Sequence, residues 1–288
     1  MKISNTQYNM ARWGKDRYKK MMELGFTAMD FSNEITDDHA SCKNGNEEFL
    51  RRVKEEKKYI TDSGIEIYQM HGPWRWPPRD LDPEDRADRM SRMKASIEGC
   101  AILGCENWVI HNIMPFGHED MALGKEKETW EMNLEFFTEL AKKAHECGVT
   151  ICVENMPMPK FSIGAPLDTV RFIKAMNDDC FKMCYDVGHA AVIPGVDPVK
   201  SVYDIKDYLR TVHIHDNLGK VDQHFIPFFG VVDWEGVGKA LRDIDFKGAF
   251  SLEVEAPAKL PDPYYEEQFK LIYKIANHIA NGASSAQA

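Results

Sequence analysis

The segment HIHDNLGKVDQHF, residues 213–225, concentrates side chains that bind cations or carry protons. The side chains in question are His213, His215, Asp216, Asp222 and His224. Imidazole and carboxylate groups crowded beside an apolar run are typical of a site that holds a metal ion or transfers a proton. Which of the two this segment serves depends on the residues that the fold brings to it.

The chain alternates short β-rich runs with segments of helical length. Helical periodicity is clearest from Thr129 to Cys147, with Gly148 placed to end the helix. One face of this segment carries Trp130, Leu134, Phe137, Ala141 and Ala144. The β-rich runs are KISNTQ, TAMDFSN, IEIYQMHG, NWVIHN, TICVEN, KMCYDVGH, TVHIHDN and AFSLEVE.

Strands joined by helical crossovers lie parallel, and eight such units close into a barrel without sheet edges. We therefore predict an α/β fold, a single (β/α)8 TIM barrel over residues 1–281, with a disordered tail at 282–288. An open doubly wound sheet is the competing arrangement. It is disfavoured because no glycine-rich dinucleotide fingerprint follows the first run and no Pro/Gly/Ser-rich linker divides the chain.

The composition narrows the class of protein. Of 288 residues, 43% are apolar and 28% are charged, which is typical of a globular protein with a core. The net charge of -10 disfavours a nucleic-acid partner, since such binding relies on Lys and Arg. Seven cysteines without a CxxC pair indicate reduced thiols, and neither a signal peptide nor an apolar stretch of about 18 residues is present. These features predict a cytoplasmic protein that does not enter a membrane.

Metal-ligand types finish the third to eighth β-rich runs. In a barrel the carboxyl ends of all strands meet at one mouth, where converging carboxylates repel one another unless a cation lies between them. Carboxylates with imidazoles suit Mn2+, Co2+, Mg2+ or Zn2+, and the absence of cysteine at these ends disfavours a thiolate zinc site. Alone, each residue is equally compatible with a core or capping role. The run-ending residues are His71, His111, Glu154, Asp186, His215 and Glu253.

Four motifs make the chain resemble, over nearly its whole length, the xylose isomerase-like barrel superfamily of sugar isomerases, ketose 3-epimerases and type IV apurinic endonucleases. The motifs are VEN, YDVGH, HIHDN and SLEVE. In the epimerases, Glu, Asp, His and Glu at these strand ends hold one divalent metal, and the His three residues after the Asp contacts substrate. The resemblance thus implies Glu154, Asp186, His215 and Glu253 as metal ligands and His189 as a substrate contact.

The endonuclease branch has further ligands, two histidines on the third and fourth strands and an Asp-x-His pair, which together hold three zinc ions. This sequence has His71, His111, Asp222 and His224 at corresponding places. The resemblance implies that these residues bind further metals or contact substrate. His213 shares a face with His215 one layer deeper in the barrel, which predicts a core or supporting role.

Two positions limit what the resemblance transfers. Glu255 shares strand parity with Glu253, so periodicity does not choose between them, although the family pattern favours Glu253. Val221 stands six residues after His215, where the ketose 3-epimerases carry an Arg. The resemblance implies a small sugar or sugar phosphate as substrate, and Val221 indicates that it need not be a free ketohexose.

These residues suggest an isomerase or epimerase that works through a metal-stabilised enediolate. Glu154 and Glu253 would remove and return a proton, with Asn155 or Asp216 supporting the ligands. Trp74, together with Trp76 in the same HGPWRWPPRD segment, would shield the sugar from water, or would only pack on the barrel rim.

Other reactions fit the same residues. A hydride shift, a dehydration or a β-elimination on a keto sugar needs the same kind of metal site. A phosphodiesterase like the apurinic endonucleases shares the ligands but would need basic loops, which this sequence lacks. A non-catalytic sugar-binding barrel is disfavoured because both glutamates are present. Members of such families often pair, so a homo-oligomer is compatible with this reading.

Overall fold

The computed structural model describes residues 1–31, 45–74, 80, 82–254, 257 and 259–282. The strands are β1 (Lys2–Thr6), β2 (Ala28–Phe31), β3 (Glu66–His71), β4 (Asn107–His111), β5 (Thr150–Glu154), β6 (Phe181–Asp186), β7 (Leu209–His213) and β8 (Ala249–Leu252). The helices are η1 (Gln7–Asp16), α1 (Arg17–Glu23), α3 (Asn46–Ser63), α4 (Pro83–Leu103), η2 (Asp120–Leu123), α5 (Glu126–Cys147), α6 (Pro166–Met176), α7 (Val187–Val192), α8 (Pro198–Ile205), α9 (Trp234–Asp243) and α10 (Asp262–Asn281).

The eight strands form one parallel sheet that closes on itself, and the predicted (β/α)8 barrel is confirmed. The strand order is β7-β6-β5-β4-β3-β2-β1-β8, so each strand neighbours the next along the chain and β8 pairs with β1. Between β7 and β8, Ile214 bridges Leu252 in parallel, and the Ile214 amide donates to the Ser251 carbonyl at 2.9 Å. This bridge closes the seam of the barrel.

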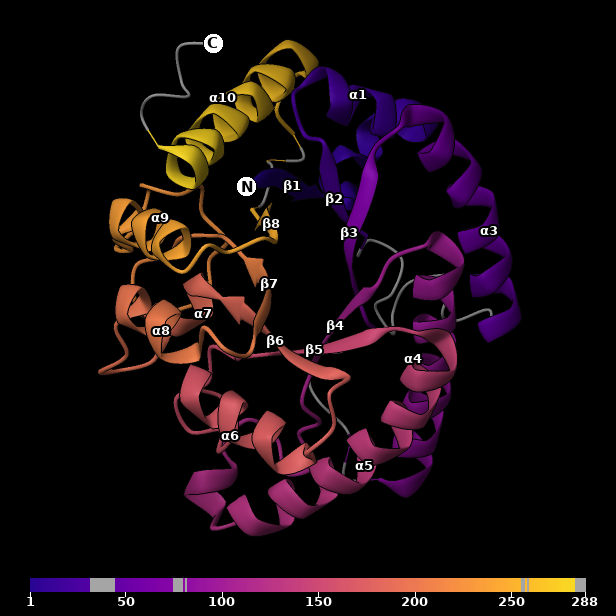
Figure 1. Cartoon of the computed structure of the whole chain (residues 1–288), viewed down its shortest axis with the longest axis vertical. Helices are drawn as coiled ribbons and strands as arrows, with labels where there is room; N and C mark the ends of the chain where they lie inside the picture. The colour runs from indigo at the N-terminus through magenta and orange to yellow at the C-terminus, as the bar shows by residue number, and fades with distance from the viewer. Residues whose placement is uncertain (32–44, 75–79, 81, 255–256, 258, 283–288) are drawn as a thin grey trace.

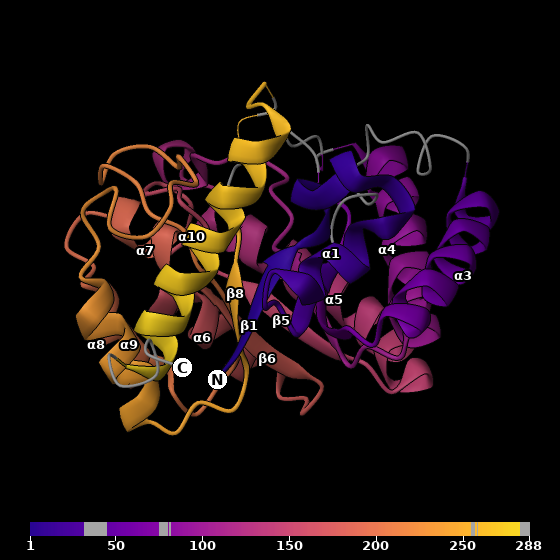
Figure 2. The ribbon, with the colours of Figure 1, turned by 90° about the horizontal axis from the view of Figure 1, so that it is seen from above.

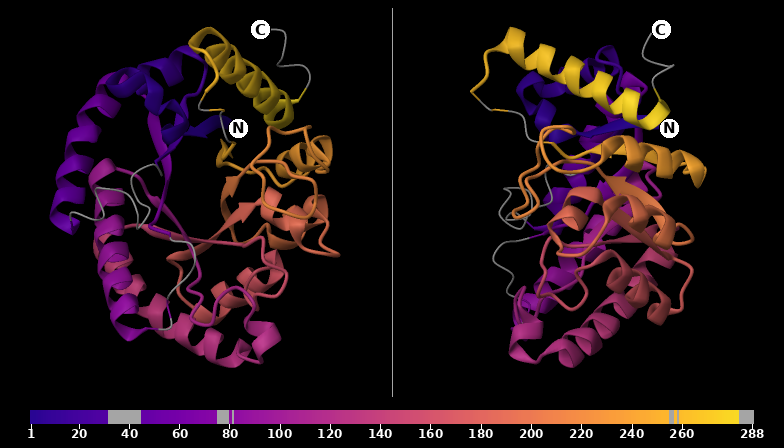
Figure 3. Two further views of the ribbon diagram at one scale, coloured as in Figure 1. Left: turned by 180° about the vertical axis from the view of Figure 1, so that it is seen from behind. Right: turned by 90° about the vertical axis from the view of Figure 1, so that its left-hand side faces the viewer.

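Helices enclose the sheet on its outer side (Figure 1). The same ring of helices is seen from behind and from the side (Figure 3). In the view from above, the N-terminus and the last turn of α10 lie at the lower edge of the barrel, at the end where β1 begins (Figure 2). The opposite end therefore carries the carboxyl ends of the strands and the loops that follow them.

Helix α5 shows how the sequence sets these helices. It starts at Glu126, three residues before the predicted start, and ends at Gly148, whose φ of 66° continues the chain in the left-handed region that suits glycine. Phe137, Ala141 and Ala144 of the predicted stripe are buried. Trp130 and Leu134 are only partly buried, because the face that contacts the sheet is centred on Phe137 and Leu140.

The core has two parts with different chemistry. Between the helices and the sheet lies a continuous apolar layer that includes Trp108, Phe137 and Phe181. Inside the barrel, fully buried polar groups face one another toward the carboxyl ends of the strands. This interior set includes Asp30, Gln69, Glu154, Asp186 and His213. Because buried polar groups are costly without partners, the interior is where function is to be sought.

Three further sequence predictions concern the cysteines, membrane-spanning segments and the C-terminal tail. Six of the seven cysteines are free, and Cys42 lies outside the described residues. None of the helices in the described ranges is both long and apolar enough to cross a bilayer. The predicted tail at 282–288 lies outside the described residues, apart from Gly282, which caps α10.

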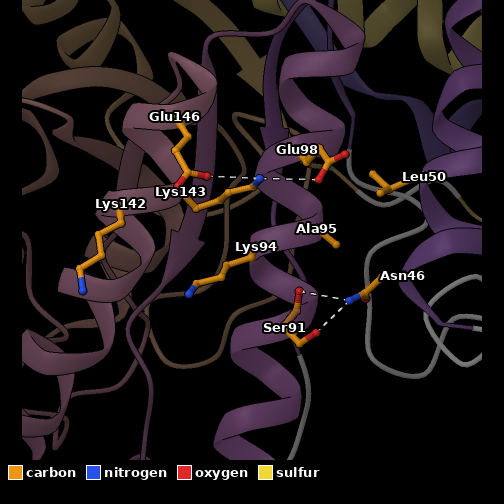
Figure 4. Close-up of a pocket in the computed structure, with 9 residues that line it drawn as sticks. All are labelled: Asn46, Leu50, Ser91, Lys94, Ala95, Glu98, Lys142, Lys143 and Glu146. Carbon is orange, nitrogen blue, oxygen red and sulfur yellow. Dashed lines mark hydrogen bonds and ion pairs between the residues drawn. The ribbon is translucent and has the colours of Figure 1, made fainter.

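A hollow on the outer surface lies among α3, α4 and α5 (Figure 4). Its lysines face glutamates, for example Lys143, whose Nζ lies 3.7 Å from Glu98 and 3.5 Å from Glu146. Asn46 donates to the Ser91 hydroxyl at 2.9 Å across the same hollow. Because the hollow contains none of the predicted site residues and its charges are paired, the site lies elsewhere.

An ion pair inside the protein fastens the segments that follow β3 and β4. Arg89 of α4 donates from one guanidinium nitrogen to both carboxylate oxygens of Asp80, at 3.0 Å each. Asp80 also accepts from the Met114 amide at 2.9 Å. Both side chains are almost fully buried. The pair therefore fixes backbone near two strand ends that carry predicted site residues.

We expect Arg89→Met to lower the free energy of unfolding by about 3–5 kcal/mol, because it removes one partner of a buried ion pair. Arg92→Met on the same helix is the matched control, since Arg92 pairs with Asp88, which is 56% exposed. The control should cost less than about 1 kcal/mol. Urea unfolding of both variants measures the difference, and equal losses would contradict the importance of the buried pair.

Candidate active site

Four side chains from the last four strands meet inside the mouth of the barrel. The Nδ1 atom of His213 lies 3.0 Å from Oε1 of Glu154, 3.2 Å from Oε2 of Glu253 and 3.9 Å from Oδ2 of Asp186. Glu154 and Asp186 end β5 and β6, and Glu253 follows β8 directly. We call Glu154, Asp186, His213 and Glu253 the central group.

The seventh strand contributes His213 to the central group, whereas the sequence analysis expected His215 in that place. β7 ends at His213, and the sheet register pairs His213 with Asp186. His213 therefore lies at the level of the other strand ends, whereas His215 lies two residues farther along the chain. The two histidines are two residues apart, so both side chains point into the barrel. The sequence does not show at which residue the strand ends.

His215 belongs to a second group, on the α7 side of the mouth. Its Nε2 atom lies 3.0 Å from Oδ1 of Asp186 and 3.6 Å from Oδ1 of Asp222. Asp222 also lies 3.3 Å from Nε2 of His189 and 3.1 Å from Nε2 of His224. The rings of His215 and His224 stack with centroids 4.0 Å apart. We call His189, His215, Asp222 and His224 the outer group.

A third group lies on the opposite side of Glu154. The Oε2 atom of Glu154 is 3.2 Å from Nε2 of His71 and 3.0 Å from Nε2 of His111. The two histidine nitrogens are 3.3 Å apart. Glu154 is thus shared, with one oxygen facing His213 and the other facing the third-strand and fourth-strand histidines. We call His71, His111 and Glu154 the β3–β4 group.

The central group is held by opposite charges. Burial opposes the charged form of Glu154, but His213 and His111 outweigh it, and the pKa of Glu154 lies well below its ordinary value. Burial likewise opposes a charged His213, yet the carboxylates around it, including Glu154 and Glu253, help to raise its pKa well above the ordinary value. An anion and a cation therefore face each other in the closed interior of the barrel.

The outer group shows the same balance. Burial opposes a charged His189, but Asp186 and Asp222 outweigh it and raise the pKa of His189 to about 10. Burial also opposes a charged His224, and its hydrogen bond to Asp222 is the largest of the effects that raise its pKa to about 9. The pKa of Asp222 is lowered despite burial, because both imidazoles hydrogen-bond to it. The single carboxylate of this group, Asp222, therefore stays anionic and attracts cations.

The residues of these groups fit divalent cations. Within each group the candidate ligand atoms lie within 4.8 Å of one another, and all are carboxylate oxygens or imidazole nitrogens. In the outer group, Oδ1 of Asp222 and Nδ1 of His215 are buried and make no hydrogen bond within the described part of the chain. Buried polar atoms without hydrogen bonds are uncommon, and a ligand or ion is one reason for them. Such a donor set suits Mn2+, Co2+ or Zn2+.

Asn155 supports two of these groups from behind. Its side chain donates to the Asp186 carbonyl and accepts from the Asp186 amide, both at 2.9 Å. Its own carbonyl lies 2.8 Å from Nδ1 of His189, which it binds as acceptor. Asn155 therefore sets the position of one member of the central group and one member of the outer group.

Asp216 has a different role from the histidines around it. Its carboxylate is fully buried and accepts from the Gly230 amide at 2.9 Å, the Val232 amide at 3.3 Å and the Trp234 indole at 2.8 Å. These bonds tie the loop between β7 and α9 to its own starting point. The loop delivers Asp222 and His224 to the mouth, so Asp216 organises the outer group without belonging to it.

The remaining expected residues are less closely engaged. Trp74 is 43% exposed, three residues beyond His71, and belongs to none of the three groups. Trp76 and Glu255 lie outside the described residues, so the choice between Glu253 and Glu255 rests on the contacts of Glu253 alone.

A further cluster joins the end of α5 to the start of β6. His145 lies 2.9 Å from Asp178, which also accepts from the Cys180 amide. The hydrogen bonds account for these contacts.

The family model for the xylose isomerase-like TIM barrel matches residues 18–275, and the chain belongs to this family. Among curated proteins, an uncharacterised protein of Sinorhizobium fredii is 26% identical over 206 residues, 70% of this chain and 64% of that protein. The D-psicose 3-epimerase of Ruminiclostridium cellulolyticum is 28% identical over 132 residues, 44% of this chain and 42% of that enzyme. The inosose dehydratase of Histophilus somni is 25% identical over 189 residues, 57% and 61% of the two chains. The chain thus spans less than two thirds of each of these relatives.

Solved structures share the fold over almost the entire chain. A D-tagatose 3-epimerase-like protein superposes with a TM-score of 0.75 at 20% identity, covering 98% of both chains. D-psicose 3-epimerase from Clostridium cellulolyticum H10 has a TM-score of 0.74 at 17% identity, covering 97% and 99%. The zinc-bound IOLI protein has a TM-score of 0.73 at 17% identity, covering 97% and 98%. At these identities the likeness establishes the barrel fold.

We expect Asp216→Asn to loosen the loop at 217–233, because either amide orientation turns an NH2 group toward backbone donors. An unsatisfied buried group of this kind costs about 1–3 kcal/mol. Hydrogen exchange should show faster exchange of the loop amides. Asp197→Asn is the control, since Asp197 caps α8 at the surface and Asn caps equally well. Unchanged loop protection in Asp216→Asn would contradict the organising role.

Proposed function

We propose that this protein is a divalent-metal-dependent isomerase or epimerase of a small sugar. The observation that carries the proposal is the central group. It brings three carboxylates and an imidazole together at the mouth of the barrel, where active sites of this fold lie. Of the three carboxylates only Glu253 is partly exposed, at 18%, whereas Glu154 and Asp186 are closed off from solvent. Glu253 is thus the carboxylate best placed to meet a substrate.

The relatives support a carbohydrate-modifying enzyme. The matched proteins include an epimerase and several inosose dehydratases. Both names describe chemistry on small polyhydroxylated molecules. The free thiols support a cytoplasmic location, and the acidic net charge supports a small-molecule substrate over nucleic acid.

In this proposal the central group holds one divalent ion through Glu154, Asp186, His213 and Glu253. When bound, such an ion polarises a substrate carbonyl and so acidifies the neighbouring C–H group. The proton then moves to Glu253, whose Oε2 faces His213 while the exposed part of the carboxylate faces the mouth. Asp186 stays ionised because His189 and His215 outweigh burial and lower its pKa. Its position is fixed because Asn155 clamps its backbone.

Glu154 is the second acid–base group of the proposal. Both of its oxygens contact imidazoles, which lower its pKa and keep it anionic. An epimerisation needs a proton donor on the other face of the substrate carbon, whereas an aldose–ketose isomerisation needs only one group. His189 would hold a substrate oxygen from the outer group, at the side where its Nε2 faces Asp222.

The number of ions is a separate part of the proposal. Glu154 belongs to both the central and the β3–β4 groups, and Asp186 contacts both the central and the outer groups. We propose that the central group fills first because it has the most carboxylates. The β3–β4 and outer groups then bind further ions or substrate oxygens, through His71, His111, Asp222 and His224. Mn2+, Co2+, Mg2+ and Zn2+ all suit the central group.

Two other reactions are supported by particular observations. The inosose dehydratase relatives favour loss of water from a keto sugar, which begins with the same proton transfer to a carboxylate. The three adjoining groups favour a metal phosphodiesterase, because such enzymes clamp phosphoryl oxygens between ions. The net charge of -10 and the acidic loops make the second reaction the weaker candidate.

Solvent hydrogen exchange tests the proposed proton transfer. The Mn2+-loaded or Co2+-loaded protein is incubated in D2O with ketoses, aldoses, their phosphates and keto sugars, and products are followed by NMR. We expect deuterium next to the carbonyl, with the rate reduced by about 10²–10⁴-fold in Glu253→Gln. A product free of deuterium would indicate a hydride shift or a shielded transfer, and loss of water would identify a dehydratase.

Glu154→Gln separates the two glutamates. If both carboxylates transfer protons, each variant loses epimer formation, but Glu253→Gln alone loses exchange at the face that it serves. Asp178→Asn, far from the mouth, is the control that keeps exchange unchanged. No turnover of any sugar by the metal-loaded protein would overturn the sugar proposal and direct attention to cleavage of abasic DNA.

Metal binding is expected to stabilise the fold, since a ligand that binds only the folded state adds to its stability. We expect chelator treatment to lower the melting temperature and Mn2+ or Zn2+ to restore it. Glu154→Gln should weaken this restoration more than Glu253→Gln, because Glu154 belongs to two groups. Calorimetry with and without metal measures both effects. A melting temperature that does not respond to any of these ions would contradict a metal centre.

A further inference from the structure

Asp30 lies beneath the central group without belonging to any of the three metal-ligand groups. It is the third residue of β2, and its side chain is completely buried. Its Oδ2 atom lies 2.9 Å from Nε2 of His213, so it contacts the opposite side of the ring from the one that faces Glu154 and Glu253. Asp30 therefore reaches across the barrel interior from β2 to the end of β7.

The direction of this hydrogen bond follows from the chemistry of the two groups. A carboxylate accepts hydrogen bonds and has none to give, so Nε2 of His213 must carry the hydrogen. The form of imidazole that binds a metal is neutral and has only one N–H group, so a hydrogen kept on Nε2 by Asp30 leaves the lone pair of that form on Nδ1. That lone pair points at Glu154 and Glu253, where a cation would lie.

Without Asp30 the opposite tautomer would be favoured. Glu154 and Glu253 are themselves acceptors, and they would draw the single hydrogen of a neutral His213 to Nδ1. With the hydrogen there, Nδ1 has no lone pair for a cation. Asp30 supplies the competing acceptor on the other side of the ring, in a place that water does not reach because both side chains are fully buried.

Other contacts fix the position of Asp30 and of the ring. The side-chain amide of Gln69 donates to the same Oδ2 atom of Asp30 at 2.8 Å. The ring of His71 stacks on that of His213, with centroids 5.7 Å apart and planes 12° from parallel. The imidazole is thus held at one edge by Asp30 and on one face by His71, which leaves it little freedom to rotate.

We propose that Asp30 is a positioning residue, which holds His213 with the hydrogen on Nε2 and so presents Nδ1 as a metal ligand of the central group. The proposal rests on the metal centre of the proposed function and is independent of the sugar reaction. Carboxylates that orient a ligating histidine in this way raise metal affinity, and their loss costs about 10- to 100-fold.

The proposed role of Asp30 is tested by substitutions that remove its hydrogen-bond acceptor, its charge or the residue that orients it. Asp30→Leu removes the acceptor at similar volume, whereas Asp30→Asn keeps an oxygen that accepts from Nε2 but removes the charge. Gln69→Leu removes only the hydrogen bond that orients Asp30. Asp120→Asn is the matched control, because Asp120 is equally buried but contacts Ser162 and none of the three groups. All are made in the complete chain.

Two measurements are made on each variant. Affinity for Mn2+ and Zn2+ is determined by competition with a chelator, after removal of bound metal. We expect it to fall about 10- to 100-fold in Asp30→Leu, less in Asp30→Asn and Gln69→Leu, and not at all in Asp120→Asn. Nitrogen NMR of labelled histidine, with His213→Gln to assign the signals, reports which ring nitrogen carries the hydrogen in the Zn2+-loaded protein. Hydrogen on Nε2 is expected in the wild type and Asp30→Asn.

The outcomes separate this inference from the proposed function. If the wild type binds these ions but Asp30→Leu matches its affinity, the positioning role is overturned and the metal centre stands. A wild type that binds neither ion overturns both. If Asp30→Leu does not fold, the comparison of Asp30→Asn and Gln69→Leu with Asp120→Asn decides, and equal affinity in all of them overturns the role of Asp30.

Discussion

The structure depends on one electrostatic constraint: a closed parallel barrel directs the ends of its strands to a common point, and here several of those ends are carboxylates. Glu154, Asp186 and Glu253 would repel one another strongly in a space that excludes water. His213 lies among all three and compensates part of their charge. The remaining negative potential would attract a cation, so the closure of the barrel is also the origin of the metal affinity that we propose.

The surroundings of this cluster are built to keep it rigid. Asn155 clamps the backbone at Asp186, and Asp216 gathers the loop that brings Asp222 and His224 into place. The Asp80–Arg89 pair does the same for the segments near His71 and His111. Each support is a buried polar group with several partners, which is the arrangement that fixes ligands most firmly. The proposed affinity for a cation and the positions of the candidate ligands at the mouth therefore depend on the loops as much as on the ligand residues themselves.

The sequence predicts the barrel well because strand and helix periods are local properties. Each of the eight expected runs overlaps an observed strand, although β6 and β7 begin one and two residues before the runs expected for them. The chemical types at the mouth were also readable, since polar residues end strands that are otherwise apolar. The sequence does not show at which level along the barrel axis each side chain lies. His213 and His215 have the same parity, and only the register with Asp186 shows that His213 is level with the strand ends. The sequence does not predict the role of Asp30, because Asp30 meets His213 across the barrel interior, a contact between β2 and β7 that no local pattern reveals.

The seam of the barrel lies at the site itself. Ile214 and Leu252 make the bridge that joins β7 to β8, and they adjoin His213 and Glu253 in the chain. Glu253 also donates its amide to the Ile214 carbonyl at 3.0 Å. A nascent chain that has not yet delivered β8 therefore lacks both the closing strand and the last carboxylate of the central group. In the proposed metal centre the full ligand set would exist only once the final strand is in place, which would couple metal loading to completion of the fold.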